Sequence, residues 1–145
     1  MVANQEQGMG RFSVEIDLTN NRDLELANAG FMPHDKVRRA RIRGVVDTGA
    51  ARLVLPESVV LELGFDTTTK SKVRYADGGV AERSIAKGVH LSYGGREGVF
   101  SAVVEPACPS ALIGAIVLED LDFLADCVGQ RLVPRDPDQI ISEIE

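Results

Sequence analysis

The sequence predicts a mostly β protein with two short helices, and three observations support this fold class. Several segments alternate apolar and polar residues with the period of two that is typical of half-buried strands. Two of the breaks between these segments are rich in glycine, as the turns of β-hairpins are. The chain has 145 residues, of which 44% are hydrophobic, so it is long enough to bury the core of one domain.

The first half of the chain is expected to form three strands, at residues 11–19, 36–46 and 52–55. A turn at residues 20–23 and a loop that lasts to residue 35 separate the first two strands. A helix over residues 56–63 follows the third strand. Pro56 suits the first turn of this helix, and Gly64 suits the position after its end.

The second half is expected to contain two β-hairpins, a strand-to-helix turn and a final strand. The hairpins are residues 72–85, which turn at Asp77-Gly78-Gly79, and residues 89–104, which turn at residues 94–96. Residues 111–119 are expected to be a strand that turns at Gly114 into a short helix. A strand at residues 131–134 is expected to end the globular part.

Composition divides the chain into one domain with two tails. Residues 1–10 are polar and are expected to be a disordered tail, residues 11–134 form the domain, and residues 135–145 form an acidic tail that is partly helical. The N-terminus lacks the apolar segment of a signal peptide, and no apolar run approaches the ~20 residues of a membrane span. We therefore expect a cytoplasmic protein with no membrane partner.

The charges and the rare residue types exclude several functions. A net charge of -6 argues against nonspecific binding to nucleic acid. Residues 36–43 are rich in arginine, and they fit either a basic patch or, as the favoured interpretation, one solvated face of a strand. The two cysteines and two histidines show no metal-binding spacing, so we expect neither a metal site nor a cofactor.

The segment VVDTGAA, residues 45–51, poses the main chemical question. Strand interiors avoid aspartate, and an unpaired carboxylate is costly to bury. Asp47 is therefore either an ordinary turn residue or a functional carboxylate held at the end of a strand. No histidine lies near it in sequence, so the chemistry left open is that of two carboxylates that share one proton around a water.

These residues resemble a known family. VVDTGA followed by RLVLP is similar to the active-site strand and loop of the retropepsin-like aspartic proteases, the single-lobe relatives of pepsin. Members of that family carry one Asp-Thr-Gly per chain and form the catalytic pair across a homodimer. They also have a flap hairpin, matched by residues 73–85, and an apolar-apolar-Gly motif, matched by Leu112-Ile113-Gly114. The resemblance covers roughly residues 11–134.

The resemblance implies a closed β-barrel lobe of the acid protease fold, with two short helices and a flap hairpin. It implies three groups of site residues: catalytic Asp47, Thr48 and Gly49; substrate-binding Ala50, Tyr75, Gly78 and Gly79; and the supporting Leu112, Ile113 and Gly114. For Tyr75, packing against a neighbouring strand is an equally good interpretation.

The function implied is that of an aspartic endopeptidase, in which an Asp dyad across a homodimer activates water to hydrolyse a peptide or protein substrate. The alternative is a noncatalytic module for peptide binding or dimerisation that keeps the fold. Viral members often form an ion pair at the positions of Ala51 and Ala115, which is lost from both sides here. The resemblance is therefore to the bacterial rather than the viral type.

Overall fold

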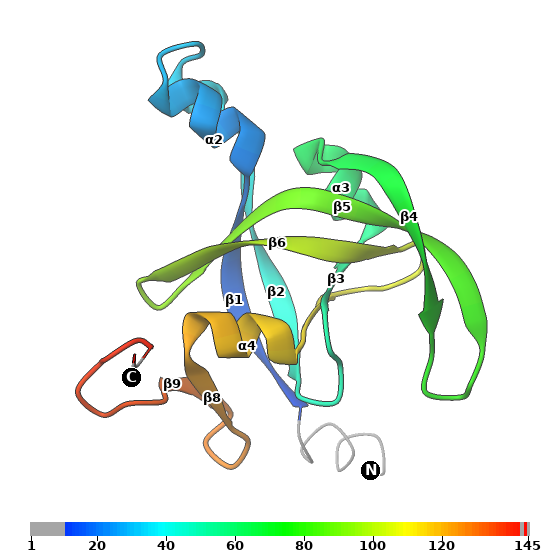
Figure 1. Ribbon diagram of the computed structural model, residues 1–145, viewed down its shortest axis with the longest axis vertical. Coiled ribbons are helices and arrows are strands. Elements are labelled where there is room, and N and C mark those ends of the chain that lie inside the picture. The colour runs from blue at the N-terminus through cyan, green and yellow to red at the C-terminus, as the bar shows by residue number, and fades with distance from the viewer. Residues whose placement is uncertain (1–10, 143, 145) are drawn as a thin grey trace.

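Nine strands and three α-helices make up the described part of the chain in this computed structural model, which describes residues 11–142 and 144 (Figure 1). The strands are β1 (Arg11–Asn20), β2 (Arg39–Asp47), β3 (Leu53–Pro56), β4 (Asp66–Arg74), β5 (Val80–Tyr93), β6 (Arg96–Glu105), β7 (Ala111–Ile113), β8 (Phe123–Asp126) and β9 (Arg131–Pro134). The helices are α2 (Asn21–Asn28), α3 (Glu57–Leu63) and α4 (Ala115–Leu121), with a short 3₁₀ helix η1 (His34–Lys36). The predicted tail at residues 1–10 lies outside the described residues.

Six of the strands close into a barrel. Their order is β1-β2-β7-β3-β6-β5, and β5 pairs again with β1 to complete the circle. The pairs β2–β7 and β3–β6 are parallel, whereas the other pairs around the barrel are antiparallel. β4 lies outside the barrel and pairs only with β5 in this sheet. The predicted mostly β fold with a closed barrel and a projecting hairpin is confirmed.

The core fills the barrel because alternate residues of each strand point inward. On β1, Phe12, Ile16 and Leu18 are buried, and on β2 the deepest residue is Val46. The core continues through inward residues of β3, β5, β6 and β7 and through the inner faces of α3 and α4. The helix α3 ends as predicted, since Gly64 adopts the left-handed conformation with φ of 65°.

One long strand replaces two predicted shorter ones. β5 runs unbroken from the first hairpin into the second, so both hairpins share it. The pairing of β5 with β6 shifts between Ala86 and Val89, and Gly88 within this shift has a φ of 71°. A bulge of this kind bends a strand, which lets β5 belong to the barrel at one end and to the projecting hairpin at the other.

The turn predicted at residues 20–23 and the first part of the loop predicted at residues 24–35 are wrong, because α2 occupies them and brings the number of described α-helices to three rather than two. The Asn20 side chain caps α2 by accepting a hydrogen bond from the Asp23 N–H at 3.1 Å. Asp23 is only 5% exposed and forms an ion pair with Arg38 at 2.8 Å. Figure 1 shows α2 standing away from the barrel beyond the ends of β1 and β2. Strand β2 begins at Arg39, later than the predicted residue 36: η1 takes up Lys36, and residues 37 and 38 lie between the two elements.

The C-terminal part also differs from the expectation. A strand was predicted at residues 131–134 and is present as β9, but it pairs with an unpredicted β8 in a separate two-stranded sheet. The described residues of the tail, 135–142 and 144, contain no helix. Asp122, in the left-handed conformation after α4, holds this tail through two hydrogen bonds from the Arg135 guanidinium, at 2.7 and 3.0 Å.

Candidate active site

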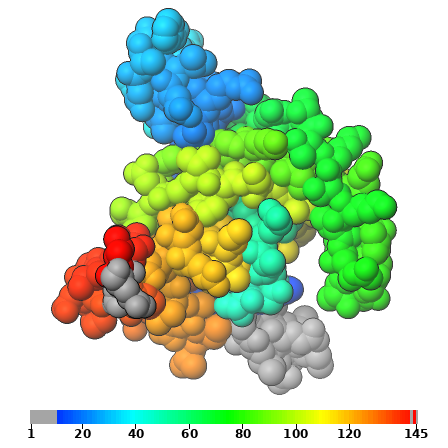
Figure 2. Space-filling model, viewed as in Figure 1, coloured from blue at the N-terminus to red at the C-terminus, as the bar shows by residue number. Residues whose placement is uncertain are grey.

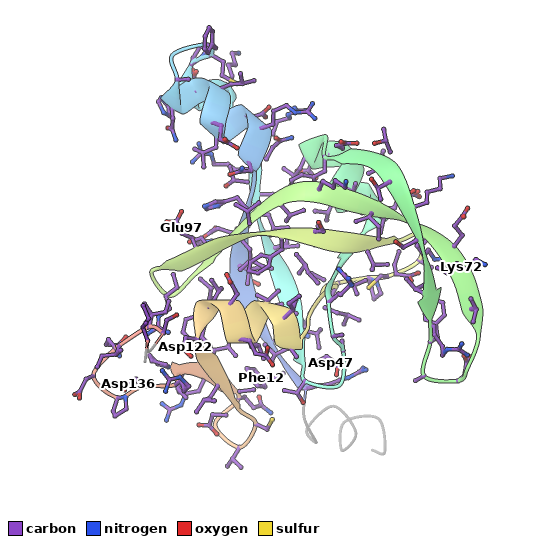
Figure 3. All side chains as sticks on the ribbon, in the orientation of Figure 1. Phe12, Asp47, Lys72, Glu97, Asp122 and Asp136 are labelled. Carbon is purple, nitrogen blue, oxygen red and sulfur yellow. The ribbon has the colours of Figure 1, made fainter. Side chains whose placement is uncertain are left out.

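Asp47 is the last residue of β2, at the end of the strand far from α2 (Figure 3). Its neighbour Val46 is fully buried in the barrel, so the side chain of Asp47 points to the opposite face of the strand. There it is 14% exposed, which makes it a largely covered but reachable carboxylate. Hence the end of this strand presents the carboxylate at the rim of the barrel.

The loop after Asp47 is a tight turn built on the Asp47 carboxylate. Its Oδ1 accepts a hydrogen bond from the Gly49 N–H at 3.0 Å, and its carbonyl accepts one from the Ala50 N–H at 3.0 Å. Thr48 and Gly49 are exposed, and within the described residues the Thr48 hydroxyl makes no hydrogen bond. The loop thus fixes one carboxylate oxygen and leaves Thr48 and Gly49 facing outward.

Arg11 holds the other oxygen of Asp47. The two residues face each other across the β1–β2 ladder, and the Arg11 Nη2 donates to Asp47 Oδ2 at 2.9 Å. The Arg11 side chain is 52% exposed, so this pair is partly solvated. Sequence reasoning missed Arg11, because its place opposite Asp47 depends on the register between β1 and β2, which the alternation within each strand does not fix.

Leu112, Ile113 and Gly114 lie directly beneath this loop. Leu112 pairs with Val45 on one side and with Val54 on the other, which fixes β7 between β2 and β3. Two main-chain hydrogen bonds then join the start of α4 to the loop, from Ala115 N–H to the Ala50 carbonyl at 2.8 Å and from Ile116 N–H to the Ala51 carbonyl at 3.0 Å.

Gly114 makes this contact possible. A Cβ atom at Gly114 would lie 2.5 Å from the Arg52 carbonyl oxygen and 2.7 Å from the Ala50 carbonyl oxygen, far inside van der Waals contact. Only glycine lets the two backbones come this close. Around Ala51 and Ala115, these main-chain hydrogen bonds join the two segments.

The predicted substrate-binding residues Tyr75, Gly78 and Gly79 lie at the tip of the β4–β5 hairpin. The Tyr75 N–H donates to the Gly79 carbonyl at 2.8 Å, and the Gly78 N–H donates to the Tyr75 carbonyl at 2.9 Å. Gly78 has a φ of 89°, a conformation that favours glycine. The Tyr75 hydroxyl donates to the carboxylate of Glu105 at the end of β6, and this hydrogen bond raises the pKa of Tyr75.

The structure brings together Asp47 to Ala50 and Leu112 to Gly114, but it does not join them to the hairpin tip. Figure 2 shows an open hollow between the hairpin and the segment that follows β2. Within the described residues no hydrogen bond connects Tyr75, Gly78 or Gly79 with the Asp47 loop. The predicted residues therefore lie on two sides of one open cleft.

Neither a metal-binding cluster nor a membrane-spanning helix is found in the part of the chain that the structure describes. There, no three His, Cys, Asp or Glu side chains gather in a way that could hold a metal ion. Each of the helices described is too short or too polar to cross a bilayer.

Comparison with known proteins agrees with this geometry. The family model described as aspartyl protease matches residues 36–117, more than half of the chain. The matched region contains the Asp47 loop, the β4–β5 hairpin and the Leu112-Ile113-Gly114 segment. A search of curated proteins finds no match. With its carboxylate loop, hairpin and supporting glycine all inside the matched region, this chain belongs to the aspartyl protease family.

Proposed function

We propose that this chain is one half of a homodimeric aspartic endopeptidase of the retropepsin-like, bacterial type, with Asp47 as its catalytic residue. The observation that carries the proposal is the Asp47 loop itself. It presents a largely covered carboxylate at the barrel rim, is supported from below by Gly114, and leaves Thr48 and Gly49 exposed. A loop with an inner support and a free outer edge is suited to meeting a second copy of itself.

A dimer is proposed because the chemistry needs two carboxylates. Within the described residues, the hydrogen-bond partners of the Asp47 carboxylate are a main-chain N–H and an arginine, not a second carboxylate. The sequence Asp-Thr-Gly occurs once in the chain. A twin Asp47 from a second chain would supply the missing group, and the exposed Thr48 would join the two loops.

The mechanism follows from placing two carboxylates in contact. Like charges at that distance cannot both stay ionised, so the pair retains one proton, as in aspartic proteases generally. The ionised Asp47 removes a proton from a water molecule, and the protonated twin polarises the carbonyl of the scissile peptide bond. The resulting gem-diol collapses when the amide nitrogen takes up a proton, and the peptide bond breaks.

Arg11 must leave Asp47 Oδ2 before the pair can form. An ion pair with so exposed a partner contributes only about 0–1 kcal/mol, because water and salt screen it. Replacing the Arg11 contact by a twin carboxylate that carries the shared proton therefore costs little free energy. In the single chain, Arg11 keeps the carboxylate from being left unpaired at the rim.

The substrate we propose is an extended peptide in the hollow between the hairpin and the Asp47 loop. Such a chain would form main-chain hydrogen bonds with Gly78 and Gly79 on one side and with Gly49 and Ala50 on the other, in the manner of strand addition. Tyr75 would line the same space. The protein would act in the cytoplasm on peptide or protein substrates, and we propose no nucleic-acid, membrane or cofactor partner.

Asp47→Asn tests the proposal, with Asp66→Asn as the matched control. Asp66 holds a similar turn, since its Oδ1 accepts from the Thr68 N–H at 2.9 Å, but it lies at the start of β4. Cleavage of a peptide library should rise more steeply than linearly with wild-type concentration, survive Asp66→Asn and vanish in Asp47→Asn while sedimentation still shows a dimer. Binding without turnover, unaffected by Asp47→Asn, would instead support the noncatalytic module.

A further inference from the structure

Glu105 connects the hairpin tip to the barrel. It is the last residue of β6, where it pairs with Pro56 of β3 in the barrel wall. One carboxylate oxygen accepts a hydrogen bond from the Tyr75 hydroxyl, and the other accepts one from Arg83 Nε at 3.3 Å. Its side chain is 18% exposed, so the contacts form at a partly covered site.

Arg83 completes the cluster from the returning strand of the hairpin. Its guanidinium carbon lies 5.8 Å from the centroid of the Tyr75 ring, within the range of a cation–π contact. It also neutralises Glu105, so the carboxylate is paired rather than left alone in a partly buried position. Tyr75, Arg83 and Glu105 therefore contact one another pairwise, and we call them the hairpin anchor.

Apart from the hairpin anchor, the described hairpin has few contacts with the barrel. β4 pairs only with β5, and the pairing of β5 with β6 begins at Ile85, so residues 71–82 project beyond the barrel. Every one of these residues except Val73 and Ala81 is exposed. Among the described residues, the Tyr75–Glu105 hydrogen bond is the only side-chain hydrogen bond from this segment to the barrel.

The anchor acts on the turn itself. Tyr75 carries the ring that reaches Glu105, and its main chain also closes the turn through hydrogen bonds with Gly78 and Gly79. Because Tyr75 makes both contacts, the position of its ring fixes the position of the tip. The tip in turn borders the hollow between the hairpin and the segment that follows β2 (Figure 2).

We propose that Glu105, oriented by Arg83, is a positioning residue that sets the place of the hairpin tip over the cleft through the Tyr75 hydroxyl. The anchor holds the tip clear of the Asp47 loop and limits its excursions, so that peptides meet a preformed opening. Its effect on peptide binding rests on the proposed function, whereas its effect on the hairpin does not.

The tyrosine content gives a test that needs no catalysis. The chain has two tyrosines and no tryptophan, so phenolate absorbance reports on Tyr75 and Tyr93 alone. The Glu105 hydrogen bond raises the pKa of Tyr75. Alkaline titration of Glu105→Gln should therefore show one tyrosine ionising at lower pH than in the wild type. Glu97→Gln, which removes a carboxylate that contacts His90 at the other end of β6, should leave the titration unchanged.

Hydrogen exchange tests the positioning. Tyr75→Phe removes a hydrogen bond to a charged group, so exchange of the amides at residues 75–79 should accelerate by about tenfold to a hundredfold. Tyr93→Phe is the matched control, since the Tyr93 ring packs edge-on against Phe123 away from the hairpin. Equal exchange in the two variants, or an unchanged titration in Glu105→Gln, would overturn the anchor.

Peptide kinetics separate this inference from the proposed function. In an active enzyme, Tyr75→Phe and Glu105→Gln should raise KM by a few-fold with a smaller change in kcat, because the chemistry at Asp47 is untouched. An enzyme whose kcat falls with KM unchanged would contradict a positioning role. If the wild type cleaves nothing while titration and exchange behave as expected, the anchor stands and the proposed function fails.

Discussion

Replacing Gly114 by alanine is the sharpest test of how the barrel supports the Asp47 loop. The added Cβ would meet the carbonyl oxygens of Arg52 and Ala50 at 2.5 and 2.7 Å, and these are backbone atoms that no rotamer change can move aside. The loop and the start of α4 must therefore separate. That movement weakens the two main-chain hydrogen bonds that join them.

The loss of unfolding free energy in Gly114→Ala can be estimated from these two effects. Forcing a methyl group into a packed site costs about 1–3 kcal/mol. Each weakened main-chain hydrogen bond removes about 0.5–1.5 kcal/mol. A central value of about 4 kcal/mol is a large part of the roughly 5–15 kcal/mol that stabilises an ordinary domain. At about 2–4 °C for each kcal/mol, the melting temperature should fall by about 8–16 °C.

Thermal and urea unfolding of Gly114→Ala measure this loss directly. Gly79→Ala is the control, because its Cβ would meet only the exposed, movable side chain of Asp77. Residual activity per folded molecule should also fall, since the displaced loop no longer presents Asp47 in the same place. A melting temperature within about 2 °C of the wild type would refute the reasoning, because it would mean that the loop yields without strain.

Two predictions concern carboxylates away from the cleft. The hydrogen bonds from Arg38 lower the pKa of Asp23 below its usual 3.8, so its stabilisation is complete above that pH and is lost as the pH falls below about 4. Asp23→Asn should therefore cost about 1.5–3 kcal/mol at pH 7 in urea unfolding, and the difference should shrink by pH 3; a difference independent of pH would contradict this. Asp122→Asn keeps a residue that tolerates the left-handed conformation but loses the Arg135 pair, so limited proteolysis should cut residues 135–142 faster, and an unchanged rate would contradict the contact.

Local patterns in the sequence account for most of the barrel. Strand β1 alternates apolar and polar residues, because one of its faces is buried and the other is in contact with water. Pro56 and Gly64 bound α3 for reasons of backbone conformation that act within a few residues. The strand-to-helix turn at Gly114 was likewise visible, since a glycine interrupts an otherwise apolar run.

Features that depend on distant partners were not predictable in this way. α2 is short and mostly polar, and it is held by an ion pair between the buried Asp23 and the half-exposed Arg38, a distant residue that no local pattern predicts. Strand β8 forms against β9, so its existence depends on a partner several residues later. Arg11 contacts Asp47, which lies 36 positions later in the chain, because of the register of β1 against β2. Glu105 contacts Tyr75, which lies 30 positions earlier, because barrel closure brings the two residues together.

The single chain already satisfies the carboxylate on which the proposed chemistry depends. Gly49 holds Oδ1 from within the loop, and Arg11 holds Oδ2 from the neighbouring strand. An unpaired carboxylate at 14% exposure would destabilise the chain, whereas this one is paired, so the barrel can fold before a twin arrives. The two oxygens differ in kind, however. The Gly49 contact lies within the turn itself, while the exposed Arg11 contact is weak enough to be exchanged. One carboxylate oxygen of Asp47 is thus held within the turn, and the other has a partner that can be exchanged. A site shared between two chains requires this arrangement.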